Sequence, residues 1–283
     1  MKPAAFDYHA PATVSAALEL LQKHEDARLL AGGQTLVPMM NFRLATPDVI
    51  IDLNRVPELA YIRLEDGRVE IGAMTRQRAL EFSPIVKEHL PLLHAAVRLV
   101  GHLPTRSRGT IGGSIANADS AAEIPMILQV LEGEVRVAGP GYEKTIPAAE
   151  LFLDAMTTSL QHGEMITGVS FPVMPSQARF AVEEFSRRHG DFAIAAVAAM
   201  IIVEDGICRK AILATAGVSP CSTRLIDAEK LLEGREISAA LIAEAASAGA
   251  SAIEPLSDRN ASEEYRRHLA KVLTRRVLER AVA

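Results

Sequence analysis

The chain has little of several features that define large protein classes. Of its 283 residues none is tryptophan, aromatic residues make up 4%, and only Cys208 and Cys221 are cysteines. Two widely spaced cysteines do not form the ligand set of an iron–sulfur cluster or a zinc ribbon, so we expect two inert thiols. The core must therefore be aliphatic, and a hydrophobic share of 49% indicates that part of the surface is buried against other subunits.

The chain also lacks an excess of positive charge and a long apolar run. A net charge of -5 argues against a nucleic-acid binder. The basic cluster at 265–280 is interpreted as the solvated face of the last helix, with a docking surface for an acidic partner as the alternative. The longest apolar run, at 192–203, is too short to span a bilayer, and the N-terminal segment lacks the apolar stretch of a signal peptide. We therefore expect no membrane span and a cytoplasmic location.

Two Gly-Gly turns stand out among the features that are present. "LLAGGQTL" (29–36) and "GTIGGS" (109–114) each join an apolar run to a helix-like segment. Backbone N–H groups at a helix N-terminus favour negative charge, and glycine lets a ligand approach the backbone. Neither turn is followed by a Walker lysine or has the GxGxxG spacing, and no HExxH motif is present. A single turn is more often a bare structural turn, but two facing turns are suited to hold a diphosphate.

Polar side chains accompany both turns. Gln34, Thr35, Thr110 and Ser114 add neutral hydrogen-bonding groups beside the glycines. The acids Asp119 and Glu123 come shortly after the second turn. They are either first-turn acids of a helix or ligands of ribose or ribityl hydroxyl groups.

The order of elements predicts an α+β protein with two domains. The first half combines a small βαβ unit with two hairpins, which turn at Asp66-Gly67 and at 139–141. The proline-containing segment 173–179 is the best boundary, and we place the domains at 1–175 and 176–283. Three strand-like runs follow the boundary and then three helices, so the second domain is expected to hold a three-stranded antiparallel sheet covered by helices.

Several segments resemble one protein family. They are "LLAGGQTLVPMMNFRLATPDVIIDLNRV", "IGAMTRQ", "RSRGTIGGSIANADSAAEIPMILQVL", "FSRRHGDFAIAAVA" and the tail "EYRRHLAKVLTRRVLERA". Together they resemble the FAD-binding medium subunit of the molybdenum hydroxylases, the family of xanthine dehydrogenase and aerobic carbon monoxide dehydrogenase. The resemblance implies a two-subdomain FAD-binding domain of the p-cresol methylhydroxylase and vanillyl-alcohol oxidase type, followed by the C-terminal domain of the family.

The resemblance also implies where FAD binds without a covalent bond. The two glycine loops are expected to hold the diphosphate, and Ile166 and the "HGDFA" segment are expected to lie near the flavin ring, although that segment is also typical of a turn that enters a strand. The candidate FAD-binding residues are Ala31, Gly32, Gly33, Gln34, Thr35, Leu36, Thr110, Ile111, Gly112, Gly113, Ser114, Asp119, Glu123, Ile166 and Asp191. We expect no catalytic residue and no metal ligand in this chain.

The chain departs from the family pattern at two places. Relatives often carry a lysine where this chain has Glu183-Glu184, and a proline where it has Ser120. The first departure argues against a cationic flavin contact at that position.

The function that the resemblance implies is electron transfer within a complex. Molybdopterin would lie in a large partner subunit and [2Fe–2S] clusters in a small one. The resemblance implies a dimer of such heterotrimers, from which electrons leave through FAD to NAD or another acceptor. One alternative is a self-sufficient flavin oxidoreductase of the same fold superfamily. An alternative of another class is a non-enzymatic nucleotide-binding module.

Overall fold

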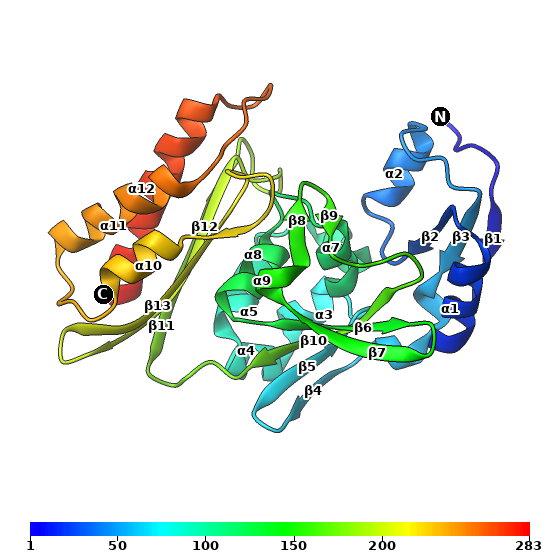
Figure 1. Cartoon of the computed structure of the whole chain (residues 1–283), viewed down its shortest axis with the longest axis horizontal. Coiled ribbons are helices and arrows are strands. Elements are labelled where there is room, and N and C mark those ends of the chain that lie inside the picture. Colours follow the sequence, from blue (N-terminus) through cyan, green and yellow to red (C-terminus); the bar gives the residue numbers. More distant parts are fainter.

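The N-terminal part of the chain is a small unit around a three-stranded parallel sheet. The computed structural model describes residues 1–283 (Figure 1). Strands β1 (Asp7–His9), β3 (Val49–Asp52) and β2 (Ala27–Leu30) pair in parallel in that order. The other elements of this unit are α1 (Val14–Lys23), α2 (Leu36–Asn41) and the short 3₁₀ helices η1 (Leu53–Arg55) and η2 (Pro57–Leu59). The predicted βαβ unit is thus β2–α2–β3, and β1 extends it by one strand.

The second part is an antiparallel five-stranded sheet with helices above one face (Figure 1). Its strands are β4 (Ile62–Glu65), β5 (Arg68–Gly72), β10 (Met165–Pro172), β6 (Glu134–Gly139) and β7 (Tyr142–Pro147), in that order. The two predicted hairpins are therefore halves of one sheet, joined by β10. The helices are α3 (Gln77–Phe82), α4 (Pro84–His89), α5 (Pro91–Val97), α6 (Leu103–Arg108), α7 (Ile111–Asn117), α8 (Glu123–Val130) and α9 (Ala148–Leu151), and β8 (Phe152–Asp154) and β9 (Thr157–Thr158) form a separate ribbon.

The C-terminal part has one strand more than the sequence predicts. Strands β11 (Ala178–Phe185), β12 (Ala195–Glu204), β13 (Ile207–Ala216) and β14 (Thr223–Arg224) form an antiparallel sheet in sequence order. The prediction of three strands missed β14 because two residues carry no readable alternation and precede a helical pattern. Helices α10 (Ile226–Leu232), α11 (Ala239–Ala252) and α12 (Glu263–Val282) complete this part. No helix of the chain has both the length and the apolarity needed to cross a lipid bilayer.

The C-terminal sheet is buried on both faces. Side chains at even positions of β11 and β12, such as Val182 and Ala198, join the large core that includes α8. Side chains at odd positions, such as Ala181 and Val197, join a second core with α12. Because successive side chains of a strand point to opposite faces, both faces must be apolar, and this explains the nearly continuous apolar run. The sheet stands between the central helices and α10 to α12 (Figure 1).

Two acidic side chains, one buried and one half-buried, lie where the C-terminal sheet meets α8. Glu123 begins α8 and is 6% exposed, and Glu184 lies at an even position of β11, where its Oε2 atom has no hydrogen-bond partner. Burial raises the pKa of Glu123 to about 8, assisted by the charges of Glu184 and Asp119, and burial raises the pKa of Glu184 to about 7. By contrast, Glu183 points to the other face and forms ion pairs with arginines of α12.

These buried acids predict a pH dependence of stability. The folded chain keeps protons on Glu123 and Glu184 that the unfolded chain releases near pH 4.5, so stability falls as the pH rises from about 4.5 to about 8. We expect the thermal midpoint of the chain to fall over this range, and Glu184→Gln to flatten the fall, as measured by circular dichroism. Glu183→Gln is the control, because it breaks ion pairs and should lower the midpoint without flattening the profile. Parallel profiles for the wild type and Glu184→Gln would contradict this assignment.

Candidate functional site

The two glycine loops lie against each other between the first two parts of the chain. The first loop, residues 31–35, connects β2 to α2. The second loop consists of residues 109–110, which connect α6 to α7, together with the first turn of α7, which holds Gly112 and Gly113. A Cβ atom at Gly32 would clash with the carbonyl of Arg108 and lie 2.8 Å from the Cα atom of Gly109. A Cβ atom at Gly113 would lie 3.2 Å from that of Ala31. Glycine is required at Gly32 because backbone meets backbone there.

The first loop presents free backbone donors. Gly33 has a φ of 71°, in the left-handed region that favours glycine. The backbone N–H groups of Gly33, Gln34 and Thr35 have no partner within the chain, and the hydroxyl of Thr35 does not cap α2. The amide of Gln34 donates back to the carbonyl of Gly32 over 3.2 Å. Successive unpaired N–H groups around a left-handed residue are suited to bind an anion.

The backbone N–H groups at 111–113 in the second loop are paired, contrary to the expectation that both turns offer unpaired donors. The N–H groups of Ile111 and Gly112 donate to the carbonyls of Thr75 and Ala73 over 3.0 and 2.9 Å, and that of Gly113 donates to Oγ1 of Thr110 over 3.0 Å. A Cβ atom at Gly112 would lie 2.8 Å from the Cα atom of Ala73. This glycine therefore serves close packing against β5 and its following turn. What this loop can offer a ligand is the hydroxyl of Ser114, at a position close to the first loop.

A chain of hydrogen bonds joins the two loops from one side. The Asn54 amide donates to the carbonyl of Ala31 over 3.0 Å, and Arg76 donates from one Nη to Oδ1 of Asn54 over 2.5 Å. The other Nη of Arg76 donates to the carbonyl of Arg108. The sequence interpretation did not single out Asn54 or Arg76, although both lie in segments that carry the family resemblance. Asn54 lies in η1, which follows β3, and Arg76 lies in the connection between β5 and α3.

The charge beside the loops is mainly positive. Burial lowers the pKa of the Arg76 guanidinium, and the nearby charge of Arg108 lowers it further. The carboxylate of Asp52 also lies near Arg76, and it accepts hydrogen bonds from Asn54 and from the hydroxyl of Tyr8. Burial alone would raise the pKa of Asp52, but these hydrogen bonds outweigh it and hold the pKa below its usual value. Two guanidinium groups and one carboxylate therefore surround the loops and favour an anionic ligand.

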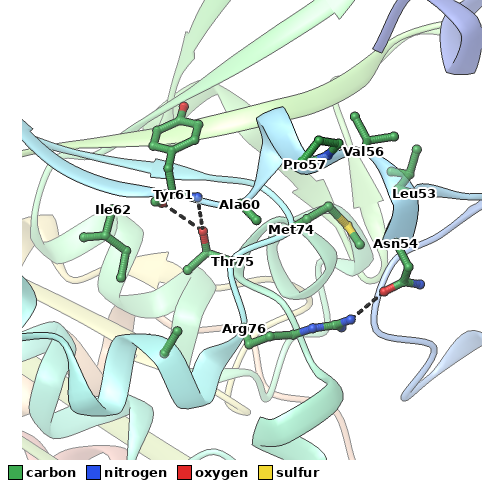
Figure 2. A pocket seen from close by; sticks show the side chains of 11 residues that line it. Leu53, Asn54, Val56, Pro57, Ala60, Tyr61, Ile62, Met74, Thr75 and Arg76 are labelled. Atoms are coloured by element: carbon green, nitrogen blue, oxygen red, sulfur yellow. Dashed lines mark hydrogen bonds between the residues drawn. The ribbon is translucent and has the colours of Figure 1, made fainter. Parts of the chain in front are cut away.

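A mostly apolar cavity of about 480 Å³ adjoins this chain of hydrogen bonds. Figure 2 shows Arg76 reaching across it to Asn54, and Thr75 bonded to the backbone of Tyr61. The rest of its wall comes from η1, η2, the start of β4, the turn after β5 and α3, and includes Val56 and Met74. The cavity can accept a flat apolar group next to the two loops.

A second, more polar cavity of about 660 Å³ lies between the central part and the C-terminal part. Asp119 and Asp191, both candidates from the sequence, line it together with Arg187 and Phe192. Arg266 fixes its wall, because this 7% exposed side chain donates to the carbonyls of Ile194 and Gly217 and to Asp258, over 2.7, 2.5 and 2.8 Å. Residues far apart in the sequence thus meet in one cavity.

Two further candidates lie outside both cavities. Glu123 is buried at the start of α8, and Ile166 is 6% exposed in β10, beside a register shift where β10 pairs with β6. The other candidates, at 31–36 and 110–114, gather at the two facing loops. The structure therefore divides the candidate residues between the loops and the interdomain cavity.

Comparisons with known proteins agree over the whole chain. Residues 4–174 match the family described as FAD binding domain in molybdopterin dehydrogenase, and residues 180–281 match the CO dehydrogenase flavoprotein C-terminal domain. The chain is 39% identical to the 6-hydroxypseudooxynicotine dehydrogenase complex subunit alpha of Paenarthrobacter nicotinovorans, covering 100% of this chain and 96% of that one. It is 36% identical to the carbon monoxide dehydrogenase medium chain of Afipia carboxidovorans, covering 100% and 99%.

Solved structures agree as closely. A chain of the carbon monoxide dehydrogenase from Hydrogenophaga pseudoflava superposes with a TM-score of 0.98 at 36% identity, covering 100% of this chain and 99% of that one. A chain of quinoline 2-oxidoreductase from Pseudomonas putida 86 superposes with a TM-score of 0.95 at 34% identity, covering 99% and 98%. With both domains matched over nearly their full length, the chain belongs to the FAD-binding medium subunits of the molybdenum hydroxylase family.

Proposed function

We propose that the chain is the electron-transfer subunit of a multi-subunit molybdenum hydroxylase. It would hold FAD and pass electrons from [2Fe–2S] clusters to an external acceptor, NAD or another molecule. The observation that carries this proposal is the pair of facing glycine loops, with three unpaired N–H groups on the first and two guanidinium groups beside them. FAD supplies redox chemistry when bound, and the chain supplies binding, orientation and charge.

The residues present fit such a ligand. The diphosphate would lie against the N–H groups of 33–35 and beside the hydroxyl of Ser114, where no Cβ atom blocks its approach. The flavin end would point toward the interdomain cavity, where Asp119 and Asp191 offer acceptors for hydroxyl or ring N–H groups. Ile166 would provide an apolar contact behind the ring, and Glu123 a nearby acid. This arrangement needs no general acid or base from the chain.

We also propose the finer organisation. The FAD-binding domain would extend over 1–175 and the C-terminal domain over 176–283, which the family matches at 4–174 and 180–281 support. A large molybdopterin subunit and a small [2Fe–2S] subunit would assemble with the chain as a dimer of heterotrimers in the cytoplasm. Support comes from relatives whose names describe a subunit alpha of a complex and a medium chain. A self-sufficient flavin oxidoreductase and a non-enzymatic nucleotide-binding module are less well supported, because these relatives match the whole chain.

The loop contact predicts the effect of one added methyl group. Gly32→Ala would push the second loop away from the first, because its Cβ atom meets the Arg108 carbonyl. We expect FAD affinity to fall about tenfold or more, an effect of about 1.4 kcal/mol, and FMN affinity to fall less, since FMN lacks the diphosphate bridge. Flavin fluorescence titration of the full chain measures both. Gly249→Ala is the control, because it adds the same methyl group within helix α11, where a Cβ atom meets only side-chain atoms, at 3.0 Å or more. Unchanged FAD affinity in Gly32→Ala would contradict the diphosphate site.

The proposed division of labour predicts what the isolated subunit does. Loaded with FAD, it should be bleached by dithionite and regain its colour with oxygen or a dye, as followed by absorption. It should not turn over an aldehyde, a heterocycle or carbon monoxide, because the chain offers no proton-transfer constellation for such a substrate. Adding the large and small subunits should restore bleaching by the substrate. Repeated turnover of an organic substrate by the subunit alone would establish the self-sufficient flavoenzyme instead.

A further inference from the structure

The separation of the two glycine loops depends on a contact between two subdomains. The first loop follows β2, whose Ala27 belongs to a core of ten residues around the parallel sheet. The second loop precedes α7, whose Ile111 and Ile115 belong to the separate core of the five-stranded sheet. Because the loops stand on different cores, something must hold them at one distance. The candidates are the packing of Gly32 on Gly109 and the hydrogen bonds made by Asn54 and Arg76.

Arg76 is suited to span the two subdomains. Its guanidinium donates in one direction to Asn54, which holds the Ala31 carbonyl of the first loop, and in the other to the Arg108 carbonyl of the second. A guanidinium presents several donors in a rigid plane, so two acceptors on opposite sides fix its position. A lysine ammonium keeps the charge but cannot reproduce this planar fork.

Asp52 fixes the orientation of the Asn54 amide. Oδ1 of Asp52 accepts hydrogen bonds from the backbone N–H and the amide of Asn54, over 2.8 and 2.5 Å. Oδ2 of Asp52 accepts from the hydroxyl of Tyr8 on β1, over 2.5 Å. The amide of Asn54 therefore cannot rotate freely, and the connection extends from strand β1 to the second loop. We call the set Asn54 and Arg76 the loop brace.

We infer that the loop brace sets the separation of the two glycine loops, and that this separation selects a diphosphate-bridged dinucleotide over a mononucleotide. The inference rests on the proposed FAD site. Asn54 and Arg76 act as positioning residues: they bind the carbonyls of Ala31 and Arg108, which leaves the N–H groups of the first loop to the ligand. The guanidinium charges of Arg76 and Arg108 lie close together, and an anion between the loops relieves their repulsion.

The test compares FAD and FMN binding to the full chain by fluorescence titration. We expect Arg76→Gln, Arg76→Lys and Asn54→Ala each to lower the affinity for FAD about tenfold or more, because each variant loses hydrogen bonds made by a charged group. The affinity for FMN should fall by less than about threefold. Arg78→Gln is the matched control: Arg78 lies two residues away, and its guanidinium stacks on Phe82, 4.7 Å from the ring centre. It should leave both affinities unchanged.

The outcomes separate three possibilities. If Arg76→Lys binds FAD like the wild type while Arg76→Gln does not, charge alone matters and the brace is wrong. Equal losses for FAD and FMN in these variants, together with a lowered thermal midpoint of the ligand-free chain, indicate general destabilisation and also overturn it. A wild type that does not bind FAD would overturn the proposed function itself, whereas a wild type that binds FAD and brace variants that bind it equally well overturn only this inference.

Discussion

The approach of backbone to backbone between Gly32 and the Arg108-Gly109 peptide is the constraint on which the site depends. At this distance no side chain fits, so a residue other than glycine at position 32 must open the gap between two subdomains. The same approach places the unpaired N–H groups of the first loop beside the packed turn of the second. The site is therefore asymmetric: one loop binds through its backbone, and the other shapes the space in which binding takes place.

The C-terminal sheet joins two hydrophobic cores, so neither of its apolar faces is exposed to water. The even-numbered side chains of β11 and β12 belong to the core that includes α8 and α5, and the odd-numbered ones to the core that includes α12. Alanine is frequent on both faces of β12, which lets the neighbouring layers approach closely. Arg266 of α12 donates to the carbonyls of Ile194 and Gly217, next to the ends of β12 and β13. These hydrogen bonds fix the edge of the sheet that borders the interdomain cavity.

Local patterns predicted much of this fold, and long-range contacts account for what they missed. The two hairpins follow from alternation around Asp66-Gly67 and the glycines at 139–141, but nothing in either hairpin indicates that β10 joins them into one sheet. The N–H groups of Ile111 and Gly112 are unpaired in a local view of the turn, yet carbonyls from 73–75 satisfy them. Local patterns did not indicate Asn54 and Arg76 for the same reason, because both side chains form hydrogen bonds with residues that are distant in the sequence, Ala31 and Arg108.

Glu123 and Glu184 determine the charge of the interface between β11 and α8. A lysine at 183 or 184 would bring a permanent positive charge to β11. In this chain Glu183 is neutralised by Arg276 and Arg280, while Glu184 has no counter-charge and a pKa of about 7. Desolvation penalises the charged carboxylate and not the neutral acid, so the two carboxyl groups beside α8 keep their protons to a higher pH than an exposed glutamate does. The charged side chains of this junction lie instead in the interdomain cavity, which Arg187, Asp119 and Asp191 line together.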